Sequence, residues 1–168
     1  MGLMLEIQPS IGPALVVGGG GVAARKVAAL VAAGFSVTVV APDVAPEIAA
    51  QSRVTIRRRE FSPSDVVGHS VAFACTGTRA VNRAVGLAAR EAGLPVVVAD
   101  SPEESTAFSP AVHRDGDLQV AVSTHGASPS LAIQVRDRIA EALGQGWDGR
   151  VDAARAAREA RLSGKRAP

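Results

Sequence analysis

The chain has 168 residues, enough for one compact domain and a small appendage. Hydrophobic residues make up 47% of it, which excludes a disordered chain, and a formal net charge of +2 is too small to predict a nucleic-acid partner. A single cysteine, Cys75, excludes an intrachain disulfide and a zinc site made of several cysteines, and its place in an apolar run predicts a buried structural thiol.

The first expected elements surround a run of four glycines, residues 18–21. A strand over residues 14–17 precedes the run, and a helix over residues 22–33 follows it. A strand, a tight glycine turn and a helix form the geometry that seats a dinucleotide pyrophosphate on a helix N-terminus. The alternative is a glycine-rich turn that binds nothing. The candidate cofactor-binding residues at this turn are Gly18, Gly20, Gly21, Val22 and Ala23.

Strands and helices continue to alternate through the first hundred residues. Further strands are expected over residues 36–40, 54–56, 71–74 and 95–99, and a second helix over residues 79–92. Short apolar runs rich in β-branched residues and separated by helices predict a parallel sheet with helices on both faces. We therefore predict an α/β, Rossmann-like domain over residues 1–110.

The pattern then changes to a hairpin and one helix. Two strand-like runs, residues 110–114 and 118–123, flank an Asp-Gly turn, and Ser128 and Pro129 begin a helix that Gly144 can end. Leu131, Val135, Ile139 and Leu143 are expected to share one face of that helix. A hairpin and one helix bury little and leave strand edges open, so we predict a homodimer built on residues 111–146.

The remaining segment, residues 147–168, is rich in alanine and arginine. Its high helix propensity and low apolar content predict a solvated helix or a frayed end rather than a nucleic-acid-binding arm. The start of the chain lacks a basic targeting segment, and Arg25 and Lys26 interrupt the most apolar stretch. We therefore expect a cytoplasmic protein that neither spans nor binds a membrane.

The chain resembles the precorrin-2 dehydrogenase / sirohydrochlorin ferrochelatase family, which includes the N-terminal part of bacterial sirohaem synthase. The resemblance covers about 130 residues in order, by the standard of motif plus structural context. The stretches that carry it are residues 16–26 with 37–42, Ala74-Cys75-Thr76 with Val81-Asn82, residues 97–100 with 107–110, and residues 118–124 with 126–132.

This resemblance implies that precorrin-2 is oxidised to sirohydrochlorin with NAD as cofactor, and that ferrous iron is inserted by many members to give sirohaem. It also implies a homodimer, and it implies that the catalytic carboxylate is that of Asp100. Asp100 follows the fifth expected strand, and ligands of open parallel sheets bind beyond the carboxyl ends of the strands. A carboxylate there could act as the general base that the loss of protons from the macrocycle requires. The alternative role for Asp100 is that of a helix cap or a turn former before Pro102.

Further candidate site residues follow from the resemblance and from the order of the expected elements. A Rossmann strand that selects NAD normally ends in an acid that binds the ribose, but Ala41 stands there, and Asp43 comes just after Pro42. Asn82 is either a cofactor contact or an ordinary amide on the helix surface. The cofactor candidates outside the glycine turn are Ala41, Pro42, Asp43, Thr76, Gly77 and Asn82.

The expected contacts of the tetrapyrrole lie after the hairpin. The family usually has glycine where this chain has His125. His125 is a contact of substrate carboxylates, an axial metal ligand or a solvent-facing loop residue. The three histidines are too scattered to predict a metal site, and His113 is expected to be structural. Arg25, Lys26, Arg79 and Arg114 are candidate partners of substrate carboxylates or else solvated charges. The candidate substrate-binding residues are Arg114, Ser123, Thr124 and His125.

Two alternatives of other classes share the glycine turn. One is a non-catalytic dinucleotide-sensing module, which would be expected to keep an acid at the end of the second strand and would not need Asp100. The other is a carrier of tetrapyrrole or metal. The longer members of the family have an additional helical module after the dimerisation helix, and the segment in that position here is only the alanine- and arginine-rich one.

Overall fold

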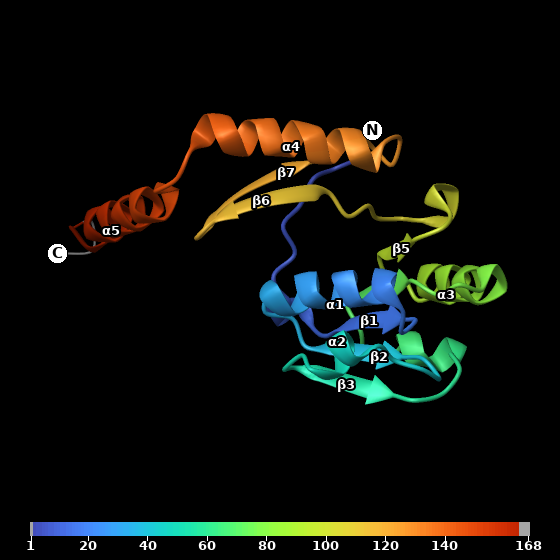
Figure 1. Cartoon of the computed structure of the whole chain (residues 1–168). Coiled ribbons are helices and arrows are strands. Elements are labelled where there is room, and N and C mark those ends of the chain that lie inside the picture. Colours follow the sequence, from blue (N-terminus) through green and yellow to red (C-terminus); the bar gives the residue numbers. More distant parts are fainter. Residues whose placement is uncertain (1, 165–168) are drawn as a thin grey trace. The chain divides into compact units, whose positions relative to one another are not determined.

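The computed structural model describes residues 2–164, and the chain divides into two compact units, Met1–Phe108 and Ser109–Pro168 (Figure 1). We call them unit 1 and unit 2. The roles assigned above to residues 1–110, 111–146 and 147–168 stay predictions.

Unit 1 is built on a parallel sheet of five strands in the order β3-β2-β1-β4-β5. The strands are β1 (Ala14–Val17), β2 (Val37–Val40), β3 (Val54–Arg57), β4 (Val71–Ala74) and β5 (Val96–Val98). The register pairs Val17 with Val40 on one side and with Ala74 on the other, so these three strands end at one edge. All residues of β1, β2 and β4 are buried, because helices cover both faces of the sheet. The predicted Rossmann-like fold is confirmed.

Two apolar layers hold the elements to the sheet. The helices are α1 (Gly21–Ala32), α2 (Pro46–Ala49) and α3 (Arg79–Glu91), with short 3-10 helices η1 (Pro9–Ile11), η2 (Pro63–Val66) and η3 (Pro102–Glu104). One layer joins α1 and α2 to the sheet through Ala23, Val27 and Ile48. The other joins α3 and η2 to it, with Val85 and Val66 fully or almost fully buried. The helix α2 and the 3-10 helices were not predicted, since such short segments show no periodicity.

Unit 2 contains a two-stranded antiparallel hairpin, β6 (Ala111–Asp115) and β7 (Leu118–Val122), followed by α4 (Pro129–Leu143) and α5 (Trp147–Gly164). Gly116 has φ of 56° in the hairpin turn, a conformation that glycine adopts without strain. The Ser128 hydroxyl accepts a hydrogen bond from the Leu131 N–H at 3.2 Å, which caps α4 as predicted. The predicted hairpin and helix are confirmed.

The expected apolar face of α4 is only partly covered within unit 2. Leu131, Val135, Ile139 and Leu143 were expected to share one face, and the side chains of Leu131 and Val135 are 49% and 38% exposed. The most buried residue of α4 is Ala132, at 5% exposure. Successive residues of a helix are about 100° apart, so Leu131 is turned away from the most buried position of α4. Unit 2 thus leaves apolar side chains uncovered.

The helix α5 starts on the hairpin turn. The Trp147 N–H donates to the Asp115 carboxylate at 2.9 Å, and the Asp117 N–H donates to Asp148 at 3.3 Å. Arg155 forms an ion pair with Asp117. These contacts join residues more than thirty positions apart, so the alternative of a frayed end is wrong for residues 147–164, whereas the expected exposure of the helix is confirmed. Within residues 2–164, no helix is long and apolar enough to span a membrane.

Candidate functional site

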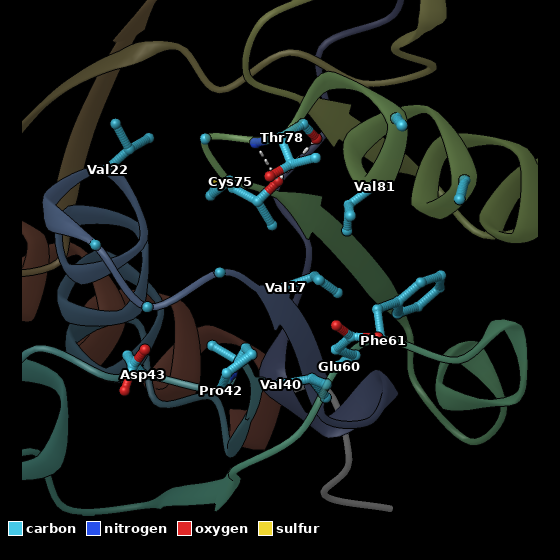
Figure 2. A pocket seen from close by; sticks show the side chains of 18 of the residues that line it. Val17, Val22, Val40, Pro42, Asp43, Glu60, Phe61, Cys75, Thr78 and Val81 are labelled. Atoms are coloured by element: carbon cyan, nitrogen blue, oxygen red, sulfur yellow. Dashed lines mark hydrogen bonds between the residues drawn. The ribbon is translucent and has the colours of Figure 1, made fainter.

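A pocket of about 690 Å³ opens in unit 1 where β1, β2 and β4 end (Figure 2). It lies beyond the carboxyl ends of these parallel strands, the usual place of ligand binding in such sheets. Most of the predicted cofactor residues line it. The lining residues are Val17, Gly18, Gly19, Gly20, Gly21, Val22, Val40, Ala41, Pro42, Asp43, Glu60, Phe61, Cys75, Thr76, Gly77, Thr78, Ala80, Val81 and Ala84.

The glycines of the turn have two different tasks. Gly18 has φ of 121°, and a Cβ added there would collide with the backbone carbonyl of Cys75. A Cβ on Gly19 would collide in the same way with the carbonyl of Asp43. By contrast, a Cβ on Gly20 or Gly21 would meet no atom within 4 Å. The first two glycines therefore let three segments of the chain pack together, and the last two face the open pocket.

The N-terminus of α1 is directed to this pocket. Gly20 is its N-cap, and among the described residues no side chain caps the helix and no acid lies in its first turn. The first N–H groups of a helix and its positive dipole end favour an anion. Val22 lines the pocket, whereas Ala23 is fully buried and packs the helix on the sheet. The turn therefore fits a diphosphate.

The turn after β4 is held by Asn82, which is fully buried at the start of α3. Its Oδ1 accepts hydrogen bonds from the Thr76 N–H at 2.9 Å and the Thr76 hydroxyl at 2.8 Å, and its Nδ2 donates to the Thr76 carbonyl at 3.0 Å. The alternative of a surface amide is wrong. Asn82 does not line the pocket; it positions Thr76, which does.

Cys75 also lines the pocket but is only 6% exposed. Burial raises the pKa of its thiol to about 11, despite the opposing effect of the nearby Lys26. Burial also lowers the pKa of Lys26. Because a thiol of such high pKa is a poor nucleophile, the structure supports the structural interpretation of Cys75.

Asp100 lies two residues beyond β5 and is exposed. The Ala99 N–H donates to the Ala74 carbonyl at 3.0 Å, so the end of β5 stays beside the end of β4. The Asp100 carboxylate acts on the Cys75 thiol by raising its pKa. Asp100 itself is not among the residues that line the pocket, but it is close enough to Cys75, which does line it, to affect the pKa of that thiol. Arg79, one of the candidate cations, pairs with Glu104 at 2.7 Å.

Two further lining residues, Glu60 and Phe61, were not predicted. They follow β3, in a turn organised by Asp65, which is 2% exposed. Asp65 accepts hydrogen bonds from Arg57 at 3.1 Å, from Arg59 at 2.7 Å and from the Ser62 N–H at 2.9 Å. These contacts, above all that of Arg59, lower the pKa of Asp65 to about 2. The only sequence signal for this part of the pocket was the acid Glu60 directly after three consecutive arginines. Such a charged run is equally typical of a solvated surface.

The candidate substrate contacts belong to unit 2. The Thr124 hydroxyl donates to the Ser128 carbonyl at 2.9 Å and accepts from the Ser128 N–H at 3.0 Å, so it supports the start of α4. His125 has φ of 55°, a left-handed backbone conformation that glycine adopts more easily than other residues. Its N–H donates to Ser123 at 3.1 Å, and Arg114 donates to Gln119. Among the described residues, no group of three histidine, cysteine or acidic side chains could hold a metal.

Comparisons with known proteins agree with this geometry. The family described as "Putative NAD(P)-binding" matches residues 5–111, and the family described as "Sirohaem biosynthesis protein central" matches residues 115–142. Siroheme synthase of Methylococcus capsulatus is 45% identical over 130 residues, which are 76% of this chain and 27% of that protein. Siroheme synthase of Methylobacillus flagellatus is 42% identical over 130 residues, with coverage of 76% and 28%.

The chain therefore spans little more than a quarter of the length of these curated relatives. Among solved structures, one titled "SirC, precorrin-2 dehydrogenase" superposes with a TM-score of 0.73 at 28% identity. That match covers 90% of this chain and 75% of the other.

Proposed function

Because the chain belongs to the NAD(P)-binding family that matches residues 5–111, we propose that it oxidises precorrin-2 to sirohydrochlorin with NAD. The observation that carries the proposal is the pocket, with its uncapped α1 N-terminus and the open space at Gly20 and Gly21. The choice of precorrin-2 as substrate comes from the names of similar proteins, the siroheme synthases and the precorrin-2 dehydrogenase.

The chemistry needs one proton acceptor from the chain. Oxidation of precorrin-2 removes a hydride and a proton, and bound NAD would supply the acceptor of the hydride. Asp100 is the group that takes the proton, because it stands beyond β5 with its side chain exposed and next to the β4 residues of the pocket. A positioned general base contributes a factor of about 100 to 10,000 to the rate. Within unit 1, the α1 N-terminus and the Thr76–Asn82 contact set the position of the nucleotide.

The second part of the proposal is a homodimer through unit 2. The two-stranded hairpin leaves both of its outer edges open within the described residues, and α4 exposes Leu131, Ile133 and Val135. A second copy of the same surface would cover both the edges and the apolar side chains. Ser123, Thr124, His125 and Arg114 of this unit are the residues that we assign to the tetrapyrrole.

The experiment is anaerobic incubation with precorrin-2 and NAD, followed by the visible absorbance of sirohydrochlorin. We expect turnover by the unchanged chain and a loss of at least about 100-fold in kcat for Asp100→Asn, with dinucleotide binding retained. Glu103→Gln, which removes an exposed carboxylate three residues away, serves as the matched control and should keep its rate. Turnover of Asp100→Asn at the control's rate would refute the catalytic role.

The same assay separates the other functions. A dinucleotide sensor would bind NAD without changing the absorbance, and a carrier would shift the tetrapyrrole spectrum without turnover. Iron insertion is the second activity that we propose, since siroheme, which gives the relatives their name, is an iron tetrapyrrole. Addition of ferrous iron to the sirohydrochlorin formed should then give the siroheme spectrum faster with the protein than without it.

A further inference from the structure

The end of β2 lacks the acid that normally recognises the adenosine ribose. Ala41 occupies that place, is 5% exposed and has no polar side-chain atom. In Rossmann domains a carboxylate there accepts hydrogen bonds from the ribose hydroxyls and repels a 2′-phosphate. If the pocket prefers NAD, another of its carboxylates has to accept the hydrogen bonds of the ribose and repel a 2′-phosphate. The lining contains two, Asp43 and Glu60.

The two carboxylates stand at different ends of the pocket (Figure 2). The backbone of Asp43 packs against Gly19, and Figure 2 shows its side chain beside the glycine turn. That is the diphosphate end, where a second negative charge would be repelled. Glu60 lies near Val40 and Phe61, away from the turn. It follows β3, the strand that pairs with β2 and places Arg57 opposite Val40.

An apolar slot adjoins Glu60. Phe61 is partly buried against the core layer of α3, together with Val81 of that helix. Both side chains line the pocket, as does Ala84 one turn further along α3. A flat aromatic base fits between a phenylalanine ring and aliphatic side chains, because its two faces bury apolar area against them. The slot therefore fits the adenine, and Glu60 adjoins the ribose that follows it.

The turn that carries both residues is anchored. Arg59 donates to the Glu60 carbonyl at 2.9 Å and to the buried Asp65 at 2.7 Å. We infer that Glu60 takes the role of the missing strand-end acid and selects NAD over NADP, with Phe61 as the seat of the adenine. This inference rests on the proposed function, since it assigns an end of the same pocket. Asp65 and Arg59 are positioning residues for it.

Direct binding of NAD and of NADP, measured by calorimetry without substrate, tests the assignment. We expect the unchanged chain to prefer NAD, and Glu60→Gln to reduce the ratio of the two affinities about tenfold, since an uncharged amide repels no 2′-phosphate. Phe61→Ala should weaken both dinucleotides by equal factors and leave the ratio unchanged. Glu47→Gln, an exposed acid of α2 outside the pocket, is the matched control.

The remaining outcomes are decisive in different ways. A ratio that responds to Asp43→Asn and not to Glu60→Gln overturns the inference and leaves the proposed function standing. So does an unchanged chain that binds both dinucleotides equally. Failure to bind either dinucleotide overturns the proposed function, and the inference with it.

Discussion

The two units of the chain are stabilised in different ways. Unit 1 contains every described hydrophobic residue that is buried, except Ala132 of α4. Two apolar layers enclose its sheet, so its fold needs no partner. Unit 2 relies on backbone pairing and on polar contacts such as those of Trp147 with Asp115. The difference teaches that one chain builds the nucleotide pocket by itself, whereas the homodimer that we propose would cover the apolar side chains that unit 2 exposes.

The largest effect is expected where unit 2 lacks a core. Leu131→Asp would place a charge in the proposed dimer interface, and we expect dimer dissociation to become about 1000-fold easier. The aspartate lies in the first turn of α4, where it favours the helix, so the unit should still fold. Analytical ultracentrifugation measures the effect.

The control for this change is Val67→Asp, which alters a valine of unit 1 that is 74% exposed. It should leave the oligomeric state unchanged, and neither variant should alter dinucleotide binding. An unchanged dissociation constant for Leu131→Asp would show that this face of α4 is not part of the dimer interface.

The next effect distinguishes the two kinds of glycine in unit 1. Gly19→Ala brings a Cβ into the Asp43 carbonyl, and we expect the free energy of unfolding to fall by about 3 kcal/mol. Gly21→Ala meets open space at the first position of α1, so the stability should stay the same or rise while dinucleotide affinity falls. Urea unfolding and calorimetry give the two quantities. Equal stabilities of the two variants would contradict this assignment of roles.

A smaller effect is expected at Asp65, whose pKa is lowered in the folded protein from its usual 3.8 to about 2. Its charge therefore stabilises unit 1 fully above the usual value, and this contribution is lost as the pH falls toward 2. Asp65→Asn should reduce the free energy of unfolding by about 2 kcal/mol at neutral pH and by much less in acid. Urea unfolding over this pH range measures it. A difference from the unchanged chain that stays constant with pH would mean that the ion pairs contribute little.

The smallest effect concerns the cap of α4. Ser128→Ala removes the hydrogen bond to Leu131 and should destabilise the helix by about 1 kcal/mol. Hydrogen exchange should quicken in the first turn of α4 and stay unchanged in unit 1. Ser36→Ala, an exposed serine of unit 1, is the control. Faster exchange throughout the chain would show that the two units do not unfold separately.

Local patterns were sufficient for most of the fold. Apolar β-branched runs predicted the five strands, and the glycines with the strand before them and the helix after them predicted the nucleotide turn. Ser128, Pro129 and Gly144 marked the ends of α4. These signals lie within a few residues of the feature they predict. They also predicted most of the pocket lining, because the strand ends of a parallel sheet meet at one edge.

Tertiary structure decided what depends on segments far apart in the chain. It buried Asn82 under Thr76 and brought Glu60 and Phe61 to the pocket. It also turned Leu131 outward and fixed the start of α5 on the hairpin turn. The sequence by itself determined the strands and the longer helices, because periodicity and capping act locally. Only the packed chain determined which polar side chains meet, because an exposed acid and a pocket acid have the same sequence pattern.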